Sequence, residues 1–222
     1  MLPVITIDGP AGAGKTSIAK AVAAALGFNY LDTGAMYRAI ALALHRKQVP
    51  LEDSARLLTA LAEIQLDVRT TASGTQVFID GEDVSLDIRE PFVSRFASQV
   101  SAIPEVRRRL VQLQRQIGQS GGIVVEGRDM GTVVFPDAIL KIFLSATVEE
   151  RARRRCHELR SAGKDVNFED TLNEIAQRDQ QDSTRADSPL RKAVGAVEVD
   201  STNMRLSDVV ALVLAQYRVK SY

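Results

Sequence analysis

The segment that most plainly predicts a chemistry is a glycine-rich loop near the start of the chain. It has the spacing G-x-x-x-x-G-K-[ST] and lies between an apolar run and a helical pattern. Glycines let the backbone turn its N–H groups inward, and a helix N-terminus adds partial positive charge, so such a loop binds the phosphates of a nucleoside triphosphate. A glycine-rich turn without a ligand would not need the Lys-Thr pair that ends the motif. The predicted triphosphate-binding residues are Gly9, Pro10, Ala11, Gly12, Ala13, Gly14, Lys15, Thr16 and Ser17.

The end of this loop predicts a metal-assisted reaction of the terminal phosphate. Lys15 is expected to bridge the β and γ phosphate oxygens and Thr16 to ligate Mg²⁺, with the hydroxyl of Ser17 as an alternative ligand. Magnesium sites of this kind usually include a carboxylate at the end of a neighbouring strand. Glu126 follows another apolar run and is favoured for that role, through water, over an ordinary strand-terminal acid. Asp8, which ends the first apolar run, is a weaker candidate.

Arginines at separate places along the chain predict a second anionic ligand. Transfer between two charged nucleotides calls for several arginines, because planar guanidinium groups bind phosphate bidentately. The candidates are Arg38, Arg107, which starts a helix in the insertion, and Arg128, which follows the third predicted strand. Arg128 lies at the carboxyl end of a predicted central strand, where open α/β sheets bind their ligands. Arg178, Asp182 and Arg185 would share one helical face, and taken alone that trio is better explained as an exposed ion-pair ladder.

A basic helical segment follows the fourth predicted strand. Its members are Arg151, Arg153, Arg154, Arg155, His157 and Arg160. Helical geometry spreads these side chains around the axis, so only Arg151 and Arg154 share a face cleanly. A lid at about 151–165 would close over the phosphates and exclude water, which favours transfer over hydrolysis.

The elements that position these residues follow an alternating pattern. Short apolar runs predict five buried parallel strands, at 4–7, 28–31, 123–125, 139–144 and 196–199. Helical patterns lie between the strands, so we expect an α/β fold with a five-stranded parallel sheet flanked by helices.

The roughly 90 residues between the second and third strands far exceed the usual crossover of a dozen or more residues. They predict a subdomain at 33–120 inserted into a single domain whose core is 1–32 and 121–222. The short segments 68–69 and 77–79 flank a turn at Ser73-Gly74, and another turn lies at Asp80-Gly81, so a small antiparallel sheet is predicted inside the insertion. Apolar stripes predict two helices around that sheet, one at Leu57, Leu58, Leu61 and Ile64 and one at Val106, Leu110, Leu113 and Ile117.

Composition limits the possible partners of the chain. Its 222 residues are 45% hydrophobic and 25% charged, with 28 basic and 28 acidic side chains. A formal net charge of zero gives no general attraction to a nucleic acid polymer or an anionic membrane. The sequence contains no run of 18 consecutive apolar residues, which is about the length that a helix needs to span a bilayer. The single cysteine, Cys156, and the lack of a secretory leader predict a reducing, cytoplasmic location.

Three classes of phosphate-loop protein compete: a small-molecule kinase, a switch GTPase and an ATPase that drives motion. A GTPase would need a guanine-specifying Asn-Lys-x-Asp sequence, which is absent from the chain. A motor ATPase would not explain the insertion or the scattered arginines. These features favour the kinase.

The segments together resemble the nucleoside monophosphate kinases, and among these the bacterial cytidylate kinases. The resemblance covers essentially the whole chain and is carried by 5–16, 31–38, 97–100, 127–136 and 178–185. The phosphate loop is shared with many unrelated families, whereas 127–136 is much more specific. The resemblance implies a P-loop kinase fold with a mobile lid and an enlarged monophosphate-binding insertion. It also implies transfer of the γ-phosphoryl group of ATP to CMP, with dCMP also accepted, by a monomer.

Carried over residue by residue, the resemblance also implies roles within the site. The residues implied to bind CMP are Thr33, Arg38, Ser98, Arg107, Arg128, Asp129, Arg178, Asp182 and Arg185. Of these, Arg38, Arg128 and Arg185 would hold the phosphate with the help of Thr33. Cytosine would be read by Ser98, Arg107 and Asp129. Asp182, with Arg178 nearby, would contact the sugar.

Chemistry agrees with these implied roles. Cytosine offers an amino donor with carbonyl and ring-nitrogen acceptors, which complement a carboxylate beside a guanidinium and a hydroxyl. Uracil reverses two of those features. No covalent intermediate or strong general base is implied, because phosphoryl transfer is catalysed by positioning and charge. The groups expected to supply that charge, besides Mg²⁺, are Lys15, Arg128, Arg185, Arg154 and Arg151.

Two departures from the family pattern leave the metal geometry open. Many relatives carry Asp where this chain has Glu126, and the residues after the loop lysine vary, here Thr16 and Ser17. Two rival functions also stay open: a kinase of the same architecture that acts on UMP or AMP, and a nucleotide-binding switch without transfer activity.

Overall fold

The central feature of the molecule is a parallel sheet of five strands. The computed structural model describes residues 3–72 and 74–221. The strands are β1 (Val4–Asp8), β2 (Asn29–Asp32), β6 (Ile123–Gly127), β7 (Leu140–Ser145) and β8 (Val197–Asp200). Their order is β2-β6-β1-β7-β8, and every pairing is parallel. The predicted strands are therefore confirmed, with ends that shift by one or two residues.

Helices cover both faces of this sheet. On one face, α1 (Lys15–Leu26) and α8 (Leu206–Lys220) pack against Ile5, Ile7 and Ile142. The other face packs against α2 (Thr33–Arg46) and α5 (Pro104–Gly118). Successive side chains of a strand point to opposite faces, so Val124 enters the first core whereas Ile123 and Val125 enter the second. This double burial explains why the strands are continuous apolar runs.

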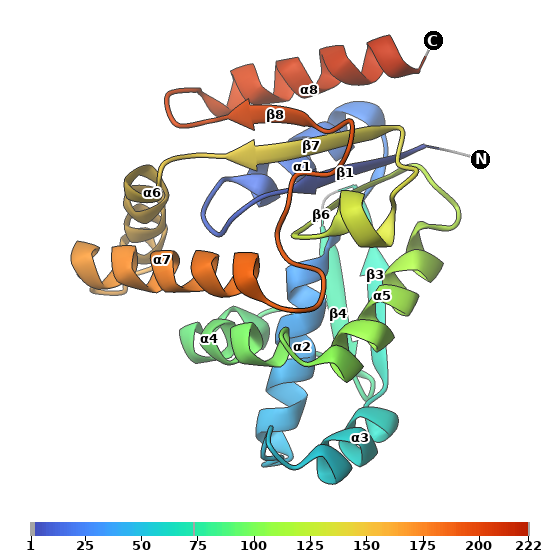
Figure 1. Cartoon of the computed structure of the whole chain (residues 1–222), viewed down its shortest axis with the longest axis vertical. Coiled ribbons are helices and arrows are strands. Elements are labelled where there is room, and N and C mark those ends of the chain that lie inside the picture. Colours follow the sequence, from blue (N-terminus) through green and yellow to red (C-terminus); the bar gives the residue numbers. More distant parts are fainter. Residues whose placement is uncertain (1–2, 73, 222) are drawn as a thin grey trace.

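The insertion predicted from sequence lies beyond the β2 edge of the sheet, opposite β8 and α8 (Figure 1). Its antiparallel sheet consists of β3 (Leu66–Thr70), β4 (Thr75–Ile79) and β5 (Glu82–Asp83). Around it are α3 (Ser54–Glu63), the short η1 (Asp87–Arg89) and α4 (Pro91–Val100). The turn predicted at Ser73-Gly74 includes residue 73, which lies outside the described residues. The stripe predicted for α3 is wrong at Leu58, whose residue is 52% exposed.

Two helices after β7 pack against each other beside the insertion, α6 (Val148–Ser161) and α7 (Phe168–Thr184) (Figure 1). The Asn167 side chain caps α7 by accepting the backbone N–H of Glu169 at 2.7 Å. Ion pairs join α7 and the loop before it to the region of α4, Glu174 to Arg95 at 3.9 Å and Lys164 to Glu90 at 3.6 Å. The α6–α7 pair is thus tethered to the insertion by side chains.

Helix α7 ends one residue before Arg185, which corrects the expectation that its helix runs through that position. Arg185 has extended backbone angles, φ −59° and ψ 142°, and begins the segment that leads to β8. In the described part of the chain, no helix has both the length and the apolar composition needed to cross a bilayer.

Candidate active site

The predicted phosphate loop connects β1 to α1 and requires glycine where the chain is most crowded. At Gly9, φ is +155° and a Cβ would stand 2.0 Å from the Leu144 carbonyl oxygen. At Gly12, φ is +76° and a Cβ would meet the Cβ of Arg151 at 3.0 Å. Any larger residue at these positions would displace the backbone that must wrap around phosphate.

The loop lysine is buried and bound to the loop itself. Lys15 Nζ donates to the Pro10 carbonyl oxygen at 2.7 Å. Burial and the nearby Arg128 guanidinium lower the pKa of Lys15 to about 7. An anion bound in the loop would offset both effects, because it would stabilise the charged ammonium.

Glu126 lies beside the loop helix, as the magnesium hypothesis requires. It is buried in β6, opposite Asp32 of β2. Its carboxylate accepts a hydrogen bond from the Tyr30 hydroxyl and interacts with the Thr16 side chain. Burial and the neighbouring Asp32 carboxylate raise the pKa of Glu126. Thr16 and Glu126 therefore place two oxygen ligands together. Thr16 and Ser17 are both exposed, so it is the contact with Glu126 that favours Thr16.

Asp8, the weaker metal candidate, has a structural role in the fold. Its carboxylate oxygens accept the backbone N–H groups of Met130 at 2.8 Å and Gly131 at 2.7 Å. These residues begin η2 (Met130–Val134), a single turn of π-helix that directly follows Asp129. Both oxygens thus anchor the segment that carries Arg128 and Asp129.

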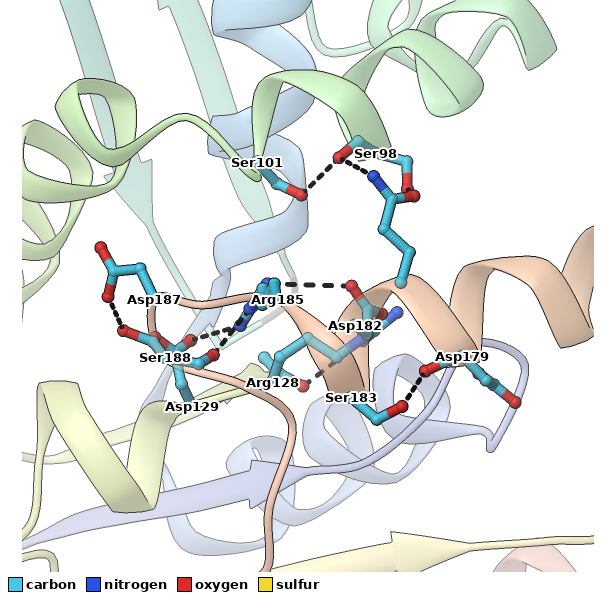
Figure 2. A network of polar contacts seen from close by, with 12 residues as sticks. Ser98, Ser101, Arg128, Asp129, Asp179, Asp182, Ser183, Arg185, Asp187 and Ser188 are labelled. Atoms are coloured by element: carbon cyan, nitrogen blue, oxygen red, sulfur yellow. Dashed lines mark hydrogen bonds and ion pairs between the residues drawn. The ribbon is translucent and has the colours of Figure 1, made fainter.

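A buried network of arginines and aspartates lies next to this segment (Figure 2). Arg107 of α5 pairs with Asp129, and Arg128 Nε donates to Asp182 Oδ2 of α7 at 2.7 Å. Arg185 lies between the two pairs, 3.9 Å from Asp129 Oδ1 and 3.7 Å from Asp182 Oδ1. The side chains of Asp182 and Arg185 are only 6% and 7% exposed, so the exposed ion-pair ladder is the wrong explanation of this trio.

Pairing and burial oppose each other in this network. Burial would raise the pKa of Asp182, but the guanidinium groups of Arg128, Arg178 and Arg185 together outweigh it and the pKa falls. Burial raises the pKa of Asp129 in spite of Arg107. Arg178 is half-buried, and its Nε has no hydrogen-bond partner among the described residues. Desolvation together with Arg128 lowers its pKa to about 10. The network therefore holds excess guanidinium groups that an anion would stabilise.

The first turns of α2 carry two more predicted residues to the same edge of the sheet. The Thr33 hydroxyl donates to the Glu126 carbonyl oxygen at 2.7 Å. Arg38 pairs with Asp32 Oδ2 at 2.8 Å, and the other oxygen of Asp32 caps α2 by accepting the N–H of Ala35. Arg38 is thus held in place by an acid that also starts its helix.

Ser98 of α4 is bound to α7. Its hydroxyl donates to Gln181 Oε1 at 2.7 Å. Through its carbonyl oxygen, Ser98 also accepts the hydroxyl of Ser101, whose own carbonyl accepts Arg107 Nη1 at 3.2 Å. Ser98 is therefore linked to the Arg107–Asp129 pair.

Arg151 and Arg154 both face the phosphate loop, in agreement with their predicted shared face. Arg151 donates to the Ala11 carbonyl oxygen at 3.0 Å and pairs with Asp179 of α7 at 2.6 Å. Arg154 donates to the Ser201 carbonyl oxygen at 2.6 Å and lies beside Gly14. By contrast, the Arg153 side chain is 65% exposed and pairs only with Glu150 among the described residues.

Several residues that shape this site were not predicted. They are Tyr30, Asp32, Asp179, Gln181 and Ser201. Each acts by contacting a predicted residue from another element, so no local pattern marks it. Tyr30 alone has a partial local signal: a phenol inside an apolar strand needs a buried hydrogen-bond partner, although the sequence does not show which one.

The phosphate loop, Glu126 and Arg128 all lie at the carboxyl ends of parallel strands, where open α/β sheets bind ligands. Within residues 3–72 and 74–221, no three His, Cys, Asp or Glu side chains gather as a ready-made metal cage. The arrangement can bind two anions side by side, one in a backbone loop and one among arginines.

Comparisons with known proteins agree with this geometry. The family model described as cytidylate kinase matches residues 5–219. A cytidylate kinase of Pelotomaculum thermopropionicum is 50% identical over 96% of this chain and 95% of its own length. One from Edwardsiella ictaluri is 46% identical over 98% of this chain and 97% of its own. A bifunctional pantoate ligase/cytidylate kinase of Synechococcus sp. is 49% identical over 97% of this chain, which spans 41% of that longer protein.

Among solved structures, a gluconokinase from Sinorhizobium meliloti superposes with a TM-score of 0.52 and 15% identity. The match covers 99% of this chain and 94% of the gluconokinase. At that identity the likeness concerns the fold alone, and it agrees with the P-loop kinase fold expected from the sequence. The match of the family model over nearly the whole chain and the identity to full-length relatives go further, and they show that the chain belongs to the cytidylate kinase family.

Proposed function

We propose that this protein transfers the γ-phosphoryl group of ATP to CMP, giving ADP and CDP, and that it also accepts dCMP. One observation carries most of the proposal: the buried arginine–aspartate network adjoins the phosphate loop. Arg128 of that network lies close enough to Lys15 to lower its pKa. The phosphates of a donor and an acceptor bound at these two places would therefore lie next to each other.

The donor half is the phosphate loop. Its inward N–H groups and the start of α1 would hold the ATP phosphates. Lys15 would leave the Pro10 carbonyl and bind the β and γ oxygens, where its charge opposes the charge of the transferring group.

Mg²⁺ fits the oxygen ligands present beside the loop. Thr16 and Glu126 interact with each other and supply a hydroxyl and a carboxylate, which suit a cation that prefers oxygen and retains water. When bound with ATP, Mg²⁺ neutralises charge on the β and γ phosphates. Thr16 would ligate it directly, and Glu126 would orient its water.

The acceptor phosphate would bind among guanidinium groups. Arg38, Arg128 and Arg185 approach the same edge of the sheet from α2, β6 and the end of α7, and Thr33 adds a hydroxyl. Each of these arginines contacts an aspartate, so it is held in position before the substrate arrives.

The cytosine base would meet Asp129, Arg107 and Ser98. The carboxylate suits the amino group of cytosine, and the guanidinium suits its carbonyl and ring-nitrogen acceptors. Asp182, with Arg178 close by, would contact the sugar hydroxyls. Asp182 is 4% exposed, which allows a strong contact with few competing waters.

In the reaction, an oxygen of the CMP phosphate bonds to the γ phosphorus of ATP as the bond from that phosphorus to the β-bridging oxygen breaks. The transition state is loose, so positioning and charge are sufficient and no strong base is needed. Arg151 and Arg154 already face the loop, and the lid at 151–165 would carry them closer as it excludes water. In this proposal 1–32 and 121–222 form the core and 33–120 binds the monophosphate.

A single assay tests the proposal. The purified protein is incubated with ATP, Mg²⁺ and each of CMP, dCMP, UMP, AMP and GMP, and ADP release is measured. We expect fast release with CMP and dCMP. Strong release with UMP or AMP and little with CMP would contradict the cytidylate assignment. Slow release that does not depend on the acceptor would indicate a nucleotide-binding switch.

We further propose a cytoplasmic location and a monomeric state. ATP and nucleoside monophosphates are small cytoplasmic metabolites, and the one cysteine, Cys156, is free. The resemblance to bacterial cytidylate kinases supports the monomer. Light scattering of the purified protein would measure its mass directly.

A further inference from the structure

The side chain that fixes the Ser98 hydroxyl is Gln181. The Ser98 hydroxyl donates to Gln181 Oε1 at 2.7 Å, and Gln181 Nε2 returns a hydrogen bond to the Ser98 carbonyl oxygen at 3.3 Å. The two residues are 83 positions apart and belong to α4 and α7. The pair thus joins the insertion to the core at the edge of the proposed base site.

The reciprocal bonds determine which way the Gln181 amide points. A carbonyl oxygen can only accept, so the Ser98 carbonyl requires the NH₂ end of the amide. That leaves the amide oxygen toward the Ser98 hydroxyl, which must then donate its proton. The Ser101 hydroxyl donates to the same Ser98 carbonyl at 2.8 Å and holds this turn of α4 in place (Figure 2).

The consequence is a hydroxyl of fixed polarity. A serine hydroxyl has one proton and two lone pairs. With its proton bound to Gln181, the Ser98 oxygen can only accept from any other group. Within residues 3–72 and 74–221 no group donates to it, so its lone pairs are available to a ligand.

We infer that Gln181 is a specificity-determining residue, because it keeps Ser98 as an acceptor toward the nucleobase. The inference rests on the proposed function, in which Ser98 lies beside the base. An acceptor at this point binds an exocyclic amino group, which cytosine carries. Uracil has a carbonyl oxygen at the same position and would place two acceptors against each other.

The test compares CMP with UMP as acceptors in Gln181→Met. Methionine has a similar length and no hydrogen-bonding amide, so the Ser98 hydroxyl becomes free to rotate and donate to uracil. We expect the ratio of kcat/KM for CMP to kcat/KM for UMP to fall about tenfold, the effect of one neutral hydrogen bond. Most of that fall should come from improved use of UMP.

Two further variants separate this role from a merely structural one. Gln181→Glu keeps an oxygen that accepts the Ser98 proton, so its ratio should stay within about threefold of wild type. Gln180→Met changes the neighbouring glutamine on the exposed side of α7 and should leave the ratio unchanged. In a Ser98→Ala background, Gln181→Met should have no additional effect on the ratio, because the hydroxyl that it controls is gone.

The outcomes distinguish this inference from the proposed function. Wild-type protein that prefers another monophosphate to CMP would contradict the proposed function, and the inference with it. Wild-type protein that prefers CMP, with an unchanged ratio in Gln181→Met, would contradict the inference alone. A fall that is equal in Gln181→Met and Gln181→Glu would also contradict it, because the acceptor oxygen would then be irrelevant.

Discussion

The donor and acceptor halves of the site are built in opposite ways. The proposed donor half is one continuous segment, 9–17, in which backbone groups and the start of α1 would bind the ATP phosphates. The acceptor half draws its side chains from α2, α4, α5, the β6–η2 segment and α7, and its Arg107, Arg128 and Arg185 are already paired with aspartates. Because Arg128 and Arg185 are held by aspartates, an incoming phosphate must compete with those carboxylates.

This difference indicates how each half would bind its nucleotide. Backbone N–H groups carry no net charge, so the donor loop without a ligand has little electrostatic cost. The exception is the buried ammonium group of Lys15. Buried guanidinium groups need partners, and breaking such a pair is costly. The acceptor half should therefore be more selective, and variants in it should affect CMP far more than ATP.

The largest effect should follow from removal of the loop lysine. Lys15→Ala takes away the only side-chain cation within the loop, and turnover should fall on the order of a thousandfold or more. Steady-state kinetics on protein shown by circular dichroism to be folded would measure this, with the exposed Lys220→Ala as a control. Near-normal turnover of Lys15→Ala would contradict its role.

Asp8, which lies just before the phosphate loop and binds the segment that follows Asp129, should make the stability of the fold depend on pH. Burial raises the pKa of Asp8 from 3.8 to about 6. The folded state then binds more protons than the unfolded state between these values, so this carboxyl lowers the stability of the fold as pH rises from about 4 to 6. This difference in pKa corresponds to about 3 kcal/mol of unfolding free energy.

Asp8→Asn removes the titrating carboxyl group and also one of the two side-chain oxygens that accept backbone N–H groups. Its loss of unfolding free energy, measured by urea denaturation, should therefore be smaller at pH 7 than at pH 4 by up to about 3 kcal/mol. An equal loss at both pH values would show that the pKa of Asp8 is not raised.

A substitution in the acceptor half should separate the two substrates. Arg128→Met leaves the buried Asp182 without its closest partner and removes a phosphate ligand. We expect kcat/KM for CMP to fall about a hundredfold, while KM for ATP changes by less than about threefold. Initial rates with each substrate varied in turn would measure both. A comparable rise in both KM values would mean that the halves are not separate.

The smallest predicted effect concerns the lid. Arg154→Met removes a guanidinium beside Gly14 and should lower kcat about tenfold. Arg153→Met removes a neighbouring arginine that is 65% exposed and should leave kcat unchanged. Equal effects of the two variants would show that orientation toward the loop is irrelevant.

The two halves also differed in how far the sequence predicted them. The donor loop and the five strands could be predicted because their signals are local: fixed spacing in one and continuous apolar residues in the other. The Arg178, Asp182 and Arg185 trio could not be resolved by spacing alone, because helical periodicity shows which residues share a face but not what covers it. The structure shows that Asp182 and Arg185 are buried against Arg128 and Asp129, which directly follow β6.

The remaining contacts depend on long-range pairing. Asp8 reaches Gly131 across 123 positions, and Tyr30 reaches Glu126 across 96. No composition or period connects such residues, and only the parallel sheet brings them together. For the same reason the sequence does not indicate that both Asp8 oxygens accept backbone N–H groups.

The most direct test of the account is the equilibrium binding of CMP and of a non-hydrolysable ATP analogue to Asp129→Ala. Asp129 is buried in the acceptor half and pairs with Arg107 of α5. Calorimetry on folded protein should show a loss of about a hundredfold in CMP affinity, with the affinity for the ATP analogue within about threefold of wild type. Equal losses for both ligands would contradict the division of the site into separate donor and acceptor halves.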